Sequence, residues 1–262
     1  MKKLIVRAGS TYPLFSALAL ALAFTLSCSS DKDDDKTPGG GANGGNPGTS
    51  GGGLPSEYTG GSCNASDYGR VEIGGRVWMA KNWGCYAQGS KCYNNDPANC
   101  AKYGMLYDWA TAMSLPSKCN STLSTDDAAC AIRTPHKGIC PSGWHIPSDA
   151  EWTALETAVG GESTAGKHLK AKEGWSDCGP SGSGKANLCE DTYNFSALRG
   201  GGGNSSGNFG TVGSYGSWWS ASEGDAYGAY GRDMGYYFEG VLRSSGNKSY
   251  FLLSVRCVKD SN

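Results

Sequence analysis

The cysteines constrain the fold of this chain more than any other feature of its sequence. The chain has 11 cysteines in 262 residues, and ten of them lie between Cys63 and Cys257. The eleventh, Cys28, follows basic residues up to Arg7 and an apolar run over 14–26, a pattern typical of an export signal. An exported chain meets an oxidising compartment, so the ten cysteines predict up to five disulfides rather than metal ligands or reactive thiols.

The residues before Cys28 indicate a separate role for that cysteine. The apolar run is shorter than the roughly 20 residues of a membrane-spanning helix. Thr25-Leu-Ser-Cys28 resembles a bacterial lipobox, although strong lipoboxes carry Leu where Thr25 stands. We therefore expect residues 1–28 to be a lipoprotein signal that ends at a lipidated Cys28, and simple secretion is the alternative. The lipid would anchor the protein on a membrane without a spanning segment.

Residues 29–56 differ sharply in composition from the rest of the chain. They are dominated by Gly, Asp, Pro, Ser and Asn, and this predicts a flexible tether. The acids within 31–35 resemble signals that send some lipoproteins to the cell surface, and solubilising charge is an equal alternative. We expect an outer-membrane lipoprotein whose single domain spans 57–262. A formal net charge of −1 gives no indication of a nucleic-acid partner.

Short spacings favour particular disulfides among the many pairings of ten cysteines. Three pairs would each close one loop: Cys92 with Cys100, Cys119 with Cys130, and Cys178 with Cys189. For the remaining four we propose Cys63 with Cys85 and Cys140 with Cys257. The last bond would join the middle of the chain to its final strand.

Three local patterns predict secondary structure before residue 165. Apolar and polar residues alternate over 71–79 around Gly74-Gly75, which predicts a hairpin with Val71, Ile73, Val77 and Met79 on one face. Apolar residues at helical spacing predict a helix over 103–114, which ends before Pro116. Ser148-Asp-Ala-Glu151 is a capping box, so a second helix should start at Ser148 and end at Gly160-Gly161.

The later part of the domain predicts strands separated by glycine-rich turns. Residues 200–210 are a polar glycine-rich stretch that we interpret as a long loop, and the patterns of 217–222, 236–242 and 250–258 favour strands. Two early helices followed by an irregular sheet give an α+β fold.

Few side chains suggest catalysis or metal binding. His136, His145 and His168 lack zinc spacing, and we expect a structural role for His145 between Trp144 and Ile146. The loop over 179–186 has phosphate-loop glycines, but Ala stands where Ser or Thr must meet magnesium, so we interpret it as a disulfide-pinned loop. A loop-borne calcium ion at 94–97 or 126–127 stays open. We therefore predict no catalytic residue, no metal and no cofactor.

Aromatic residues between 218 and 239 are the best functional signal. In strands, alternation should leave one ring of Trp218-Trp219 and one of Tyr236-Tyr237 on the outer face, while Trp219 and Phe238 fill the core. Exposed rings beside polar groups suit sugar faces, because the ring covers C–H groups while neighbours bond hydroxyls. The resulting candidates for ligand contact are Trp218, Tyr227, Tyr230, Arg232, Asp233 and Tyr236.

Several motifs together resemble a known family. They are spread over most of 63–260 and include segments within 71–82, 102–110 and 138–152, and also Phe195-Ser-Ala-Leu198, Trp219-Ser-Ala-Ser222 and Ser254-Val-Arg-Cys257. In this order they resemble the Fibrobacter succinogenes major paralogous domain, common in exported chains and lipoproteins. The resemblance implies a C-type-lectin-like α+β fold with two helices and an irregular, looped antiparallel sheet. It brings no catalytic residues, and the calcium-binding triplets of lectins are not found.

The leading hypothesis is a non-catalytic surface lipoprotein whose domain binds a polysaccharide or a surface protein. The alternatives are an envelope hydrolase that uses acids such as Asp225 or Asp233, and a structural component of a surface assembly.

Overall fold

The computed structural model describes residues 61–175 and 188–261. By internal contacts the chain divides into two units, 1–49 and 50–262, and all described residues belong to the second. Several predicted features lie outside the described residues. They are the lipoprotein signal with Cys28, the tether over 29–56, the predicted start of the domain at residue 57, Cys178 and the loop over 179–186. Within the described part, no helix is both long and apolar enough to cross a bilayer.

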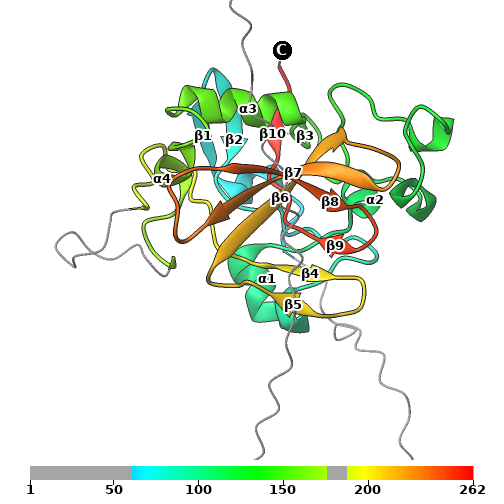
Figure 1. Ribbon diagram of the computed structural model, residues 1–262, viewed down its shortest axis with the longest axis horizontal. Helices are drawn as coiled ribbons and strands as arrows, with labels where there is room; N and C mark the ends of the chain where they lie inside the picture. Colours follow the sequence, from blue (N-terminus) through cyan, green and yellow to red (C-terminus); the bar gives the residue numbers. More distant parts are fainter. Residues whose placement is uncertain (1–60, 176–187, 262) are drawn as a thin grey trace, which may run out of the picture. The chain divides into compact units, whose positions relative to one another are not determined.

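The described part of the second unit combines four short α-helices with three antiparallel sheets (Figure 1). The helices are α1 (Pro97–Tyr103), α2 (Trp109–Ala112), α3 (Asp149–Ala158) and α4 (Ala165–Leu169). The first sheet has the strand order β1 (Arg70–Ile73), β2 (Arg76–Met79), β10 (Val258–Lys259) and β3 (Trp144–His145). The second has the order β5 (Phe209–Gly210), β4 (Gly202–Asn204) and β9 (Phe251–Leu252). The third has the order β6 (Tyr215–Glu223), β7 (Gly228–Gly235) and β8 (Leu242–Asn247). The α+β prediction is therefore confirmed.

The β1–β2 hairpin forms where it was predicted, but its faces differ from the expectation. Gly74 and Gly75 have φ values of 61° and 73°, which suit a two-residue hairpin turn. This turn pairs Val71 with Trp78, and paired residues share a face of the sheet. Val71 and Ile73 therefore pack with Trp78 in one apolar cluster, whereas Val77 and Met79 join another. The prediction that all four share one face was wrong.

The single helix predicted over 103–114 is broken into two shorter ones. Gly104, with a φ of 80°, ends α1, and its N–H donates to Cys100 O. Leu106 then forms a bridge with Lys91, and the Asp108 side chain accepts from Thr111 N to start α2. The apolar spacing was real, but a glycine in left-handed backbone conformation and a new N-cap interrupt the helix within it.

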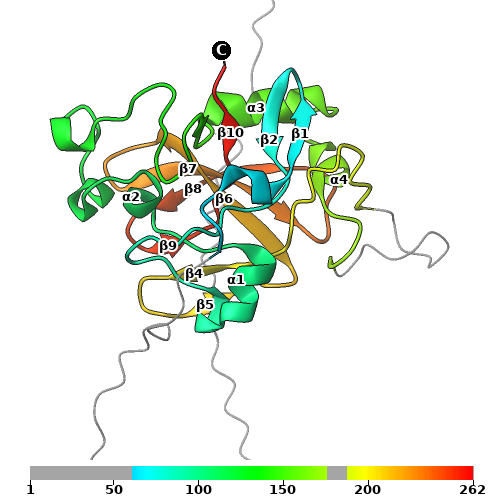
Figure 2. The same cartoon turned by 180° about the vertical axis from the view of Figure 1, so that it is seen from behind.

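The α3 helix agrees closely with its sequence signals. Ser148 and Glu151 form both hydrogen bonds of the predicted capping box. The helix ends at Ala158, and Gly160 and Gly161 follow with φ values of 113° and 92°. In Figures 1 and 2, α3 lies along the sheet that contains β1, β2 and β10.

The later strands are only partly where the sequence predicted them. The strand over 217–222 lies within β6. The stretch 200–210 contains β4 and β5 rather than a long loop, and both views place this hairpin beside α1 (Figure 2). Residues 236–241 are the turn between β7 and β8, and 250–258 contains two short strands instead of one. Alternation does not reveal where a strand turns away from its neighbour.

Four disulfides match the predicted pairs: Cys63–Cys85, Cys92–Cys100, Cys119–Cys130 and Cys140–Cys257. Cys189 is also disulfide-bonded, and its predicted partner, Cys178, lies outside the described residues.

The core divides into two large clusters separated by β6. Trp218 and Trp219 are both fully buried, but they point to opposite faces of this strand. Trp218 joins the cluster around Trp152 and Phe195, and Trp219 joins the cluster around Tyr107. The sheet of β6, β7 and β8 therefore has one covered face, below α3, and a second face that is covered only in part.

Candidate functional site

The six predicted ligand-contact residues do not form one site. On β7, Tyr230 and Arg232 point to one face and Asp233 to the other, because side chains alternate along a strand. Trp218 and Arg232 have no exposed surface. Both proposals of direct ligand contact are therefore corrected: neither side chain can touch a ligand in this fold.

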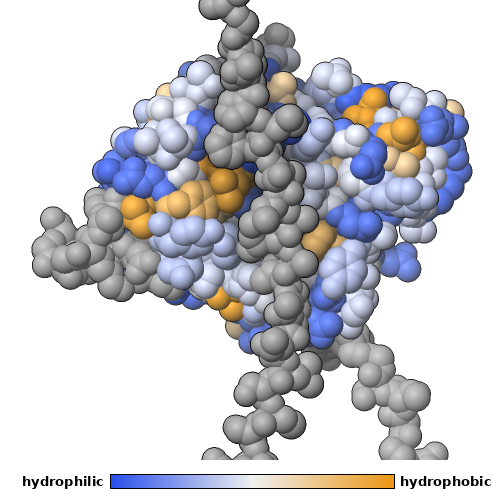
Figure 3. Space-filling view, in the orientation of Figure 1, coloured by the Kyte–Doolittle hydropathy of each residue, from blue (hydrophilic) through white to orange (hydrophobic). Residues whose placement is uncertain are grey.

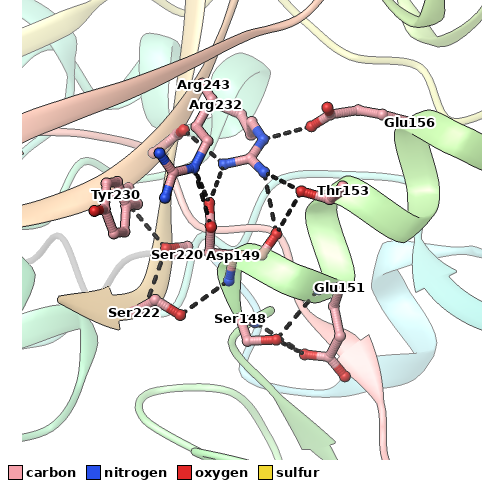
Figure 4. Close-up of polar contacts among 11 residues, drawn as sticks. Ser148, Asp149, Glu151, Thr153, Glu156, Ser220, Ser222, Tyr230, Arg232 and Arg243 are labelled. Atoms are coloured by element: carbon pink, nitrogen blue, oxygen red, sulfur yellow. Dashed lines mark hydrogen bonds and ion pairs between the residues drawn. The ribbon is translucent and has the colours of Figure 1, made fainter. Parts of the chain in front are cut away.

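Arg232 is buried in a network of polar side chains from α3 (Figure 4). Its Nη1 lies 2.6 Å from Asp149 Oδ1, its Nη2 lies 2.9 Å from Thr153 Oγ1, and its Nε donates to Glu156. Asp149 also accepts from Arg243 Nε at 2.9 Å. Burial opposes ionisation of Asp149, but the bonds from the two arginines lower its pKa. Asp149 thus joins α3 to β7 and β8, a role that its helix-capping position does not reveal.

Tyr230 belongs to the same covered face. The guanidinium of Arg243 lies 3.6 Å from the centre of its ring, as the cation–π geometry requires. Tyr230 is therefore half-buried against Arg243, and it too serves the contact between the sheet and α3.

The opposite face of the sheet carries a different set of side chains. Ser217 on β6 pairs with Asp233 on β7, and Asp233 pairs with Leu242 on β8. The neighbouring pairs place Tyr215 and Ser244 on this face as well. Ser217, Asp233 and Ser244 are half-buried, and Leu242 is 46% exposed. We call these five residues the outer face.

Asp233 is the acidic side chain at the centre of the outer face. Burial raises its pKa, whereas hydrogen bonding from Ser217 and Ser244 and the charge of Arg232 act in the opposite direction. Among the described residues it forms no ion pair. A carboxyl group held between two hydroxyls without a cation on the same face can accept hydrogen bonds from a ligand's hydroxyl groups.

Aromatic rings border one end of the outer face. Tyr215 and Tyr237 lie with their hydroxyl oxygens 2.9 Å apart, and the Tyr237 and Phe238 ring centres are 5.1 Å apart. Tyr237 is 55% exposed. Burial and the bond to Tyr237 raise the pKa of Tyr215 to about 12. Figure 3 shows apolar residues gathered near the β7–β8 turn. This turn carries Phe238, and Leu242 begins β8 directly after it.

The buried Lys170 fixes this aromatic end. Its Nζ donates to Gly235 O at 2.9 Å and to Phe238 O at 2.6 Å. A side chain on Gly235 would collide with Phe238, so the ring lies directly against the strand. The position of the Tyr237 and Phe238 rings therefore depends on Lys170, which directly follows α4 and is distant from both in the sequence.

A second aromatic pair lies toward the opposite end of the same sheet. Phe251 is 38% exposed, and its ring centre is 5.0 Å from that of Tyr250. A side chain on Gly246 of β8 would come within 3.3 Å of the Phe251 ring. The outer face is therefore bounded by aromatic rings near both ends of β8.

The remaining predicted residues lie elsewhere. Tyr227 is 62% exposed in the β6–β7 turn, where Asp225 Oδ1 accepts from Tyr227 N and Gly228 N. Tyr236 is half-buried and packs against the Trp218 cluster. The exposed member of its pair is Tyr237, because 236–241 is a turn and not a strand. Sequence reasoning missed Tyr215, Ser217 and Ser244, which only the strand register brings beside Asp233.

No metal site stands out in the part of the chain that the structure describes. Residues 61–175 and 188–261 contain no group of three or more His, Cys, Asp or Glu side chains that could hold an ion. Asp127, one of the acids considered for calcium, accepts instead from Ala129 N and pairs with Lys118.

Among the comparisons with known proteins, only the one with family models gave a match. No curated protein and no solved structure matches it, so the lectin likeness of the fold stays a prediction. The model of the Fibrobacter succinogenes major domain matches residues 71–259, which covers the hairpin, α3, the outer face and the final strand. The chain therefore belongs to the Fibrobacter succinogenes major domain family.

Proposed function

We propose that this protein is a non-catalytic surface lipoprotein whose domain binds an extracellular polysaccharide at the outer face. The observation that carries the proposal is the position of Asp233: a half-buried carboxyl group between Ser217 and Ser244, in a sheet bordered by exposed aromatic rings.

The chemistry of sugars supports this use of the surface. A pyranose ring has C–H groups on its faces and hydroxyl groups around its edge. Tyr237 and Phe251 offer flat rings to the first, and Asp233 with its serine neighbours offers acceptors and donors to the second. The two aromatic ends favour an extended ligand over a single sugar. The amino-terminal lipid predicted at Cys28 would keep such a domain at the cell surface.

The test is binding of the purified, non-reduced protein to a glycan array and to insoluble cellulose. Tyr237→Ala should weaken binding about eightfold, since loss of about 50 Å² of apolar contact costs about 1.25 kcal/mol. Tyr227→Ala is the matched control, because it removes an equally exposed tyrosine at the other end of β7. Absence of binding to every glycan, or equal losses in both variants, would refute the proposal.

The hydrolase alternative has less support from the geometry. Asp225 lies in the turn before Gly228, and Asp233 lies five residues beyond Gly228 along β7. At about 3.4 Å per residue, their backbones are about 17 Å apart, too far for a pair of carboxyls around one glycosidic bond. Release of reducing sugar from any polysaccharide by the wild-type protein, lost in Asp233→Asn, would support the hydrolase instead.

If the ligand is a surface protein, or if the protein is part of a surface assembly, a different experiment should give the positive result. Cross-linking of whole cells would then yield a stable complex that Tyr237→Ala does not disturb.

A further inference from the structure

An open cavity of about 390 Å³ lies between residues 89–91, the turn from β4 to β5 and residues 249–252. Its size falls within the range of small-molecule sites. The lining includes two charged side chains, Lys91 and Asp108, and the turn residues Ser205 and Ser206. The chemistry of the cavity depends on which of these groups already have partners.

Asp108 is committed to the structure of the protein. Its Oδ1 accepts from Thr111 N at 3.1 Å and from Asn120 Nδ2 at 2.8 Å, and its Oδ2 accepts from Thr111 Oγ1 at 2.6 Å. These bonds cap α2 and hold Asn120, whose side chain in turn accepts from Ala110 N. Three neutral donors therefore hold the carboxylate in place, and its negative charge stays on the cavity wall.

Lys91 has no such partner. Its backbone is fixed by two hydrogen bonds with Leu106, of 2.9 and 2.8 Å. The side chain is half-buried, and within the described residues its ammonium group makes neither an ion pair nor a hydrogen bond. The cavity thus contains one cation that has no direct partner among the described residues, and one carboxylate that is held by donors of its own.

The turn on the other side of the cavity is rigid but has free donors. Asn204 is buried, and its Oδ1 accepts from Ser206 N at 3.0 Å and from Asn208 N at 3.1 Å. Its Nδ2 donates to Tyr250 Oη at 3.2 Å. The hydroxyls of Ser205 and Ser206 have no partner among the described residues, and both residues are exposed.

We propose that this cavity binds the anionic group of a small polyhydroxylated ligand, a carboxylated or sulfated sugar. Lys91 binds the anion, and the hydroxyls of Ser205 and Ser206 bond to the anion or to the sugar. None of the five outer-face residues lines this cavity.

The test uses three forms of one sugar: galacturonate, galactose 6-sulfate and galactose. Titration calorimetry with the full-length protein, without reductant, should show binding of at least one anionic form and none of galactose. Added salt should weaken the binding, because the interaction is partly exposed. The anionic form that binds more tightly identifies the carboxylate or the sulfate as the preferred group.

Lys91→Met should weaken this binding about tenfold or more, equivalent to about 1.4 kcal/mol. Lys102→Met is the control, because Lys102 is an exposed lysine of α1 that lies over the Tyr103 ring and does not line the cavity. Ser206→Glu is a second variant in an exposed turn, where it places a repelling charge without disturbing packing. Unchanged affinity in a folded Lys91→Met or Ser206→Glu protein, or equal binding of galactose, would overturn the proposal. Tyr237→Ala should leave the affinity intact, which separates this site from the outer face.

Discussion

Replacing His145 by glutamine is expected to remove a pH-dependent part of the stability of the domain. The His145 side chain on β3 is only 3% exposed and lies between two carboxylates. Its Nε2 is 2.9 Å from Glu151 Oε1, and its Nδ1 is 2.7 Å from Asp260 Oδ1. Both partners are acceptors, so both ring nitrogens must carry a proton, and only the charged imidazolium can make both bonds. Glutamine has one donor nitrogen and cannot reach both.

The size of the effect follows from the exposure of the two partners. Glu151 is 15% exposed, and a hydrogen bond between charged groups in such a site contributes about 1.5–3 kcal/mol. Asp260 is 42% exposed, so solvent screening limits its bond to about 1 kcal/mol or less. The His145→Gln variant should therefore lose about 1.5–4 kcal/mol where the imidazolium is fully formed.

The sign of the pH dependence can be worked from the pKa shifts. Burial disfavours the charged imidazole, but its bonds to Glu151 and Asp260 raise the pKa of His145 above 6.5. This contribution is complete below pH 6.5 and is lost as pH rises through the raised pKa. Burial opposes ionisation of Glu151 too, yet its bonds to His145 and Ser148 lower its pKa from 4.5 to about 2. That contribution is complete above pH 4.5 and is lost as pH falls toward 2.

The pair therefore stabilises most between the two ordinary pKa values, 4.5 and 6.5. When the imidazole loses its proton, the bond to Asp260 should be lost first, because Glu151 is also held by Arg76 Nη1 at 2.9 Å. Within the described residues, Asp260 then keeps only its backbone hydrogen bond to Gly143 O, of 3.0 Å, next to the pairing of β10 with β3.

The assay is urea unfolding of the oxidised protein, followed by tryptophan fluorescence at about pH 5.5 and about pH 9. The difference between wild type and His145→Gln should be large at the lower pH and much smaller at the higher. His168→Gln, at the more exposed histidine of α4, is the control. A destabilisation of the same size at both pH values would show that packing, and not the charged imidazole, is what the substitution removes.

Two further predictions concern the links between distant parts of the chain. Loss of the Cys140–Cys257 bond, which spans 117 residues, should lower the free energy of unfolding by about 5 kcal/mol by the chain-entropy argument. Loss of Cys92–Cys100, which spans 8 residues, should lower it by about 2.5 kcal/mol. Urea unfolding of the two double Cys→Ala variants measures both losses, and a larger loss for the short loop would contradict the argument. Arg232→Met should cost about 3–5 kcal/mol, since it leaves the buried carboxylate of Glu156 without its cation, whereas Asp149 keeps Arg243. A shift of less than about 1 kcal/mol in the same assay would mean that Glu156 is neutral in the fold.

Features that depend on neighbouring residues could be predicted from the sequence. Two adjacent glycines are enough for the β1–β2 turn, and the spacing of Ser148 and Glu151 is enough for the capping box of α3. Four disulfides could be assigned from spacing and elimination. In each case the interacting groups lie close in sequence or are few in number, so few arrangements compete.

The candidate site could be predicted only as a region. The sequence predicted ligand contact by aromatic and polar residues around Asp233, but it counted the buried Trp218 and Arg232 among the contact residues. Other elements cover the face of β6 and β7 that carries Trp218 and Arg232, and no local pattern reports that coverage.

The sequence by itself thus determined the α+β class, the family, the capped helix and the disulfide pairs, because short-range chemistry or a small set of cysteines decides them. Only the tertiary structure decided that Asp149 binds the arginines of β7 and β8 and that Ser217 and Ser244 flank Asp233. It also decided that Lys91 has no side-chain partner within 61–175 and 188–261. These depend on strand register and on which helix covers which face. Both are fixed by contacts between segments many residues apart, and such contacts leave no periodic trace in the sequence.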